Sequence, residues 1–162
     1  METFEKIYTD NYEAMFRVAR KMVYDVDVVS DIVQEVFIYF FDKVNRGDEV
    51  RYPKSWLYRA TYNKCIDYWR DKKRFVAIDL LDSSEIEEQN FDNSEMKVVL
   101  NKAIDKLKPQ EKFLVVLYSE GLSYKEIAEV TEMKFSSVGK TLSRILKKIE
   151  KKLIHQYDEL YN

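Results

Sequence analysis

Basic and aromatic residues alternate through one stretch of the chain, residues 51–74, "RYPKSWLYRATYNKCIDYWRDKKR". This stretch holds eight Lys or Arg residues against only two acids, Asp67 and Asp71. Cations follow a phosphate backbone and release its counterions, and exposed rings can stack on unpaired bases. A surface with both features fits melted or single-stranded DNA better than intact duplex. The alternative is that most of the rings are core residues, as we expect for Leu57 and Trp69, and that the cations are only solvated.

A second polar and basic surface is predicted in residues 122–145, "LSYKEIAEVTEMKFSSVGKTLSRI". Ile127, Val138 and Leu142 have the spacing of two short helices that close around a small core. Ser123 and Glu126 form the capping-box pattern at the start of the first of these helices. The second helix turns polar and basic side chains outward, as does a helix that enters a major groove. The alternative is a helical hairpin with a solvated basic face.

An acidic surface is predicted earlier, in residues 30–40, "SDIVQEVFIYF". Asp31, Gln34, Glu35 and Ile38 stand at i, i+3, i+4 and i+7, so they share one face of a helix whose opposite face is almost wholly apolar. On composition alone, an amphipathic helix with solvated acids is the favoured interpretation.

Two stretches of helical periodicity position these surfaces. The first predicts three helices, which begin near Phe4, near Val28 and at Pro53, where a proline suits the first turn. The second predicts four helices, the last of them running from about Phe135 through Lys152 or beyond. Between the two stretches, residues 79–95 hold seven acids and no base. We therefore predict an all-α protein with two small helical domains, 1–75 and 96–155, joined by a flexible acidic linker over 76–95.

Composition excludes several classes of protein. Three glycines and two prolines among 162 residues favour helix over an all-β fold. No apolar run reaches the roughly 18 residues of a membrane span, and no secretory signal begins the chain, so we expect a cytoplasmic protein. Cys65 and His155 are single, and no glycine-rich phosphate loop or nucleophile–base pair is present. We therefore expect no disulfide, metal, cofactor or catalysis.

In this order, the three surfaces resemble those of an extracytoplasmic-function sigma factor, the compact branch of the sigma-70 family of RNA polymerase. "DIVQEVF" resembles the region 2.2 helix that docks on the clamp coiled coil of the polymerase. "SWLYRATYNKCIDYWR" resembles regions 2.3–2.4, and "KLKPQEKFLVVLYSEGLSYKEIAEV" resembles the entry and helix-turn-helix of region 4. The resemblance covers both predicted domains.

The resemblance implies a protein without catalysis of its own, which binds the clamp and flap of core RNA polymerase, recognises the −10 and −35 promoter elements and opens the −10 region. Polymerase binding would fall to Asp31, Gln34, Glu35 and Ile38. Binding of −10 DNA, including a flipped base near residues 45–51, would fall to Asn45, Arg46, Arg51, Lys54, Trp56, Arg59, Asn63, Lys64, Asp67 and Arg70. Binding of −35 DNA would fall to Ser136, Ser137, Lys140, Thr141, Arg144, Lys147 and Lys148. An anti-sigma factor or other accessory regulator is the usual further partner, here a separate protein.

Three residues depart from the family pattern in the helix-turn-helix. Glu132 stands where a turn glycine is usual, Lys134 where Ser or Thr commonly caps the helix, and Gly139 where Lys or Arg is frequent. A lost cap and an interior glycine each cost about 1 kcal/mol. We therefore predict weak −35 binding that depends on polymerase contacts or an accessory factor.

Two other functions remain open on the sequence. A helix-turn-helix regulator of duplex DNA, acting without polymerase, would use only the last domain. A helical adaptor that binds only proteins would leave both basic surfaces unused.

Overall fold

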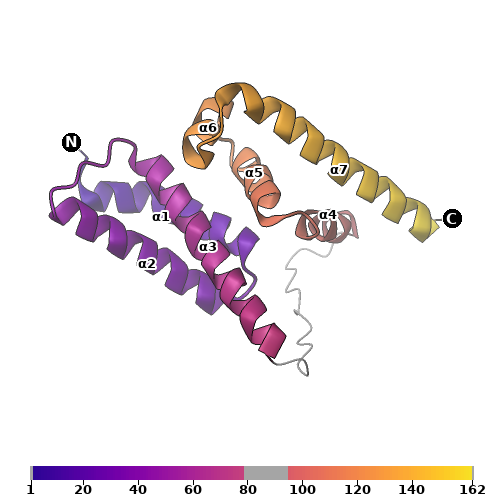
Figure 1. Ribbon diagram of the computed structural model, residues 1–162, viewed down its shortest axis with the longest axis horizontal. Coiled ribbons are helices and arrows are strands. Elements are labelled where there is room, and N and C mark those ends of the chain that lie inside the picture. The colour runs from indigo at the N-terminus through magenta and orange to yellow at the C-terminus, as the bar shows by residue number, and fades with distance from the viewer. Residues whose placement is uncertain (1, 79–94, 162) are drawn as a thin grey trace. The chain divides into compact units, whose positions relative to one another are not determined.

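The computed structural model describes residues 2–78 and 95–161, with side chains described for 2–73 and 95–159. These residues form seven helices and no strand, which confirms the all-α prediction. The helices divide into two compact units, α1–α3 and α4–α7 (Figure 1).

The first unit is a three-helix bundle of α1 (Phe4–Met22), α2 (Val26–Asn45) and α3 (Pro53–Ile78). Side chains cap the N-termini of the first two helices. Thr3 Oγ1 accepts a hydrogen bond from the Lys6 backbone N–H, and the Asp25 carboxylate accepts from the backbone N–H groups of Asp27 and Val28. All three helices contact one another around a core of fully buried side chains. Its largest members are Met15, Val18, Met22, Val23, Val29, Val33, Phe40 and Leu57.

A ladder of aromatic rings joins α1 to α2. Phe4, Tyr8, Tyr12 and Phe16 are four residues apart, so their rings follow one side of α1. The ring of Tyr8 lies 4.8 Å from that of Phe37 between centroids, at an edge-to-face angle of 66°. Ring pairs of this kind stabilise a fold by about 0.5–1.5 kcal/mol beyond their burial, so the ladder fixes how α2 lies on α1.

The second unit consists of α4 (Glu95–Asp105), α5 (Pro109–Ser119), α6 (Tyr124–Thr131) and α7 (Phe135–Tyr161). Within this unit, α4, α5 and α6 each pack against α7, the longest helix (Figure 1). The helix boundaries expected from the sequence are present. Pro109 is the first residue of α5, and Gly121 follows the end of this helix with φ of 84°. The core of this unit includes Leu117, Ile127, Val130, Val138, Leu142 and Ile145.

Two helices extend further than the sequence indicated. The third helix continues to Ile78 rather than about Lys72, so residues 76–78 of the predicted linker are helical; no proline or glycine stops the helix there. The last helix continues to Tyr161, past the predicted domain end at 155. Glu95, the last residue of the predicted linker, is the first residue of α4. Residues 79–94 of the predicted linker lie outside the described residues. No helix in the described part is both long and apolar enough to cross a membrane.

Candidate nucleic-acid and protein interfaces

The acidic face of α2, comprising Asp31, Gln34, Glu35 and Ile38, lies on the solvent side of the helix. All four side chains are exposed, and Ile38 retains 58% of its accessible surface. Tyr39, which the sequence analysis did not single out, is 54% exposed beside it. Tyr39 stands four residues after Glu35, and this spacing alone indicates that it lies on the same face of the helix. An apolar centre within a polar rim is the composition of a protein–protein interface.

An ion pair joins this acidic face to α3. Lys64 Nζ lies 3.1 Å from Glu35 Oε2, and it also lies 4.7 Å from the centroid of the Tyr39 ring. The hydrogen bond to Glu35 raises the pKa of Lys64, outweighing the lowering by partial burial. The lysine is therefore held as a cation between a residue predicted to bind polymerase and a helix predicted to bind DNA.

The residues predicted to bind −10 DNA gather along the loop after α2 and one side of α3. Gly47, with φ of 85°, turns the chain in this loop. Exposed members of the set are Asn45, Arg46, Arg51, Lys54, Asn63, Asp67 and Arg70, and half-buried members are Trp56, Arg59 and Lys64. Asp67 and Arg70 pair with each other at 3.7 Å.

Between α2 and α3 lies a cavity of about 340 Å³. Five of the predicted DNA-binding residues line it: Arg46, Trp56, Asn63, Lys64 and Asp67. The fold adds Val36, Tyr39, Lys43, Asp48 and Ala60. Lys43 Nζ lies 3.5 Å from Asp48 Oδ2, which ties the end of α2 to the loop. The size is at the lower end of small-molecule pockets, and the lining offers one aromatic ring system from each helix together with charged groups.

The rings of α3 are not equally available for stacking on bases. Tyr58 is buried and belongs to the core, whereas Tyr52 is exposed. Burial also raises the pKa of Tyr62. Leu57 is buried as expected; Trp69 is only half-buried, but its Nε1 donates to the Met22 carbonyl oxygen at 2.7 Å, so it anchors α3 to α1.

The turn between α6 and α7 is left-handed at Glu132, with φ of 60° and ψ of 20°. It is the only described non-glycine residue with positive φ. An L-residue in this conformation costs roughly 1–2 kcal/mol, which explains physically why a glycine suits this position. Before this turn, Ser123 and Glu126 form the predicted capping box, with both reciprocal hydrogen bonds at 3.1 Å.

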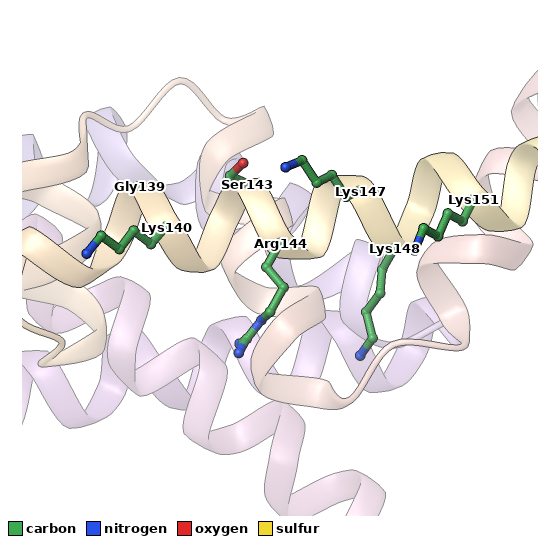
Figure 2. A pocket seen from close by; sticks show the side chains of 7 residues that line it. All are labelled: Gly139, Lys140, Ser143, Arg144, Lys147, Lys148 and Lys151. Carbon is green, nitrogen blue, oxygen red and sulfur yellow. The ribbon is translucent and has the colours of Figure 1, made fainter.

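The basic face of α7 consists of Lys140, Ser143, Arg144, Lys147, Lys148 and Lys151. Their spacings of three and four residues place them on one side of the helix. They line a hollow that runs along α7, and Figure 2 shows their side chains following one another, with Arg144 and Lys148 pointing the same way. Of the other residues predicted to bind −35 DNA, Ser136 is exposed, and Ser137 and Thr141 are half-buried. Lys151 was not predicted, although it continues the same spacing.

One cation of this face is part of an ion pair within the unit. Lys148 Nζ lies 3.2 Å from both carboxylate oxygens of Glu111, at the start of α5. Burial opposes ionisation of this carboxyl, but hydrogen bonds from Lys148 and from the Lys108 backbone outweigh it and lower the pKa of Glu111. Lys148 therefore braces α7 against α5 as well as adding positive charge.

Gly139 has a packing partner. A Cβ atom at this position would lie 3.3 Å from Cε2 of Tyr124, the first residue of α6. That separation is tighter than ordinary van der Waals contact, so the glycine allows the tyrosine ring to lie directly against α7.

The described side chains include no group of three or more His, Cys, Asp or Glu residues that could hold a metal ion.

Comparisons with known proteins agree across both units. A family model described as sigma-70 region 2 matches residues 7–75, and one described as sigma-70 region 4 matches residues 97–149. The RNA polymerase sigma factor SigV of Bacillus subtilis is 30% identical over 140 residues, which are 86% of this chain and 84% of that protein. The sigma factor SigM of the same organism is 28% identical over 148 residues, 84% of this chain and 88% of that protein.

A solved structure has the same fold. It is the sigma factor RpoE of Bartonella quintana, in complex with the anti-sigma factor NepR. The likeness has a TM-score of 0.71 and 18% identity, and it covers 93% of this chain and 96% of that chain.

Proposed function

The chain belongs to the sigma-70 family of RNA polymerase sigma factors, in the extracytoplasmic-function branch, and we propose that its three surfaces divide the work of promoter-specific initiation. A sigma factor binds core RNA polymerase and promoter DNA. One observation carries the division: the first unit turns an acidic face on α2 and a basic, cavity-bearing face on α3 to solvent.

The acidic face of α2 is the polymerase contact. Ile38, with Tyr39 beside it, supplies exposed apolar area, and Asp31, Gln34 and Glu35 supply the polar rim. Acids on this face favour a positively charged partner helix and disfavour DNA, since carboxylates repel phosphates.

The face of α3 holds the opened −10 element. Exposed cations follow the backbone of the non-template strand, and the cavity between α2 and α3 accepts one base turned out of the stack. Trp56 and Tyr39 offer ring surface to that base, and Asn63 and Asp67 offer hydrogen-bonding groups. Taking one base out of the duplex helps to hold the strands apart.

The basic face of α7 contacts −35 duplex DNA. Ser136, Ser137, Lys140, Thr141 and Arg144 lie nearest the end of the helix that enters the major groove, and Lys147 and Lys148 follow towards the phosphates. The strained turn at Glu132 supports weak −35 binding, since its conformation lowers the stability of the unit that holds α7 and its carboxylate repels a nearby phosphate. Gly139 does not support it in the same way, because its lack of a side chain serves the contact with Tyr124.

A separate anti-sigma protein is the proposed regulator. The solved relative of the same fold is bound to one, and the exposed apolar residues on α2 offer a surface that such a protein would cover. We assign no catalytic step to this chain, and we place it with the polymerase in the cytoplasm.

In vitro transcription with core polymerase on a genomic library tests the proposal. We expect new start sites that depend on this protein, with −10 and −35 elements shared among them. The matched variants are Ile38→Asp, which should abolish the start sites by loss of core binding, and Asn63→Ala, which should weaken them while core binding is kept.

A core-polymerase pull-down distinguishes the proposed sigma-factor function from that of a helix-turn-helix regulator. A helix-turn-helix regulator that acts alone would bind promoter DNA without retaining core polymerase. Failure of the wild-type chain to bind core polymerase or to direct any start site would refute the proposal.

A further inference from the structure

The first residue of α7, Phe135, has a large apolar side chain that its own unit does not cover. It is 64% exposed, although it directly follows the turn of the helix-turn-helix. Isolated exposed apolar residues are common on proteins, so its position must carry the argument.

Phe135 stands at the end of α7 that approaches DNA in the proposed function. Side chains on a helix tilt towards its N-terminus, so a ring on the first residue projects beyond the helix end. In helix-turn-helix proteins, the N-terminal residues of the second helix contact base edges. The neighbouring Ser136 is also exposed, and Lys140 follows one turn later.

The ring has no polar atom, and this limits what it can recognise. It cannot accept or donate a conventional hydrogen bond, and it gives no charge to a phosphate. The apolar group that a base pair displays in the major groove is the C5 methyl of thymine, and phenylalanine is among the side chains that contact it.

We propose that Phe135 is a specificity-determining residue, which selects a thymine in the −35 element by contact with its C5 methyl group. This inference rests on the proposed function, because it requires that α7 enters the −35 major groove. It adds a preference for thymine that the cations of the basic face cannot supply, since Arg and Lys in the major groove pair with guanine and their contacts to phosphate are the same for every sequence.

The free energy of this contact can be estimated from the size of the methyl group. Burying one methyl-sized group is worth roughly 0.8 kcal/mol, which corresponds to about a fourfold change in binding or initiation. Such a preference fits an element that is otherwise held by charge.

Replacement of thymine by uracil provides the test, because uracil lacks only the C5 methyl group. The holoenzyme is assayed by in vitro transcription on a mapped promoter, with each −35 thymine replaced singly by uracil. With the wild-type chain, we expect one position to lose about fourfold in initiation, as for one methyl-sized group. With Phe135→Ala, we expect the thymine promoter to fall by a similar factor and the uracil promoter to show no further loss.

Two variants serve as controls. Phe135→Leu keeps an apolar side chain and should retain part of the thymine preference. Tyr157→Ala removes a ring of similar exposure, 57%, from the other end of the same helix, and should leave the ratio of thymine to uracil unchanged.

The outcomes separate this inference from the proposed function. No initiation by the wild-type chain on any thymine promoter would refute the proposed function. Initiation that is equally strong on thymine and uracil promoters at every position, or a −35 element without any thymine, would overturn the role of Phe135. An equal loss on both promoters with Phe135→Ala would also overturn it and would indicate that the ring contacts protein or backbone.

Discussion

The two units differ in how the cations on and beside their proposed DNA-binding surfaces are held. In the first unit, Lys64 pairs with Glu35 and Lys43 with Asp48, so two of the three cations that line the cavity lie beside acids, and Arg46 is the third. Arg70 pairs with Asp67 further along α3. In the second unit, none of Lys140, Arg144 and Lys147 forms an ion pair with another described residue. Fixed groups suit the recognition of one base in one place. Unpaired cations on a single helix suit attraction to a phosphate backbone and release many counterions.

This contrast predicts that the two units differ in their dependence on salt. DNA binding by the first unit should weaken less with added salt than binding by the second, because two of the cations at its cavity are already paired with acids. Four sets of variants test this difference.

The largest effect is expected from removing charge along α7. The triple change of Lys140, Arg144 and Lys147 to Gln should lower −35 DNA binding on the order of a hundredfold and reduce the log–log salt slope by about 2.7, or 0.9 per phosphate contact. Binding is measured by fluorescence anisotropy of holoenzyme across a salt series. The same change at Lys21, Lys97 and Lys102 removes equal charge elsewhere, and an equal loss of slope there would refute a localised basic face.

The next effect concerns the turn that positions α7. Glu132→Gly should stabilise the second unit by about 1 kcal/mol, because glycine tolerates the left-handed conformation at φ of 60°. Glu132→Ala is the matched control, since it removes the charge but keeps Cβ. Chemical denaturation measures stability, and −35 binding measures function. Equal stability of the two variants would mean that backbone strain does not weaken this turn.

A smaller effect is expected at the ion pair between α2 and α3. Glu35→Gln and Lys64→Met should show a coupling of about 0.5–1 kcal/mol in a double-mutant cycle on stability, since both partners are partly exposed to solvent. Glu35→Gln should also leave the Lys64 side chain less firmly held at the cavity. We expect this change to weaken initiation from templates that are mismatched at −10. Additive single changes would show that Lys64 is not braced, and the contrast between the units would then fail.

The smallest effect is expected from the acid dependence of Glu111. Because hydrogen bonds lower its pKa in the folded state, its contribution is present above the unfolded value of 4.5 and is lost as pH falls through the folded value. Glu111→Gln should cost about 0.5–1 kcal/mol at pH 7, the size of a partly exposed pair. It should also flatten the loss of stability on acidification. Denaturation at pH 7 and below pH 4 measures this, with Glu150→Gln, an exposed change on α7, as the control.

The sequence predicted those features that depend on local order. The helical spacing of apolar residues predicted all seven helices, and Pro109, Gly121 and Ser123 marked boundaries in the second unit because turns and caps need particular residue types. Family membership, which the motifs at three separate places indicated, was also predicted correctly. The assignment of individual residues to polymerase or DNA stays a prediction.

The features that the sequence did not predict depend on how helices cross. Tyr58 and Tyr52 look alike in the sequence, yet one is buried and the other exposed, because only one of them faces the bundle. The cavity requires two helices, so Tyr39 could not be placed beside Trp56 beforehand. Lys148 forms an ion pair with Glu111, which is 37 residues away in the sequence, and no local pattern indicates such a contact.

The contact between Tyr124 and Gly139 also has a consequence for how this protein can change by mutation. A substitution at Gly139 places its Cβ against the tyrosine ring at 3.3 Å, so it meets an obstacle while Tyr124 is present. A change at Tyr124 made first removes the obstacle. The two positions are therefore coupled: a new cation at position 139 requires the Tyr124 ring to shift by a few tenths of an ångström, and a smaller residue at position 124 removes that requirement.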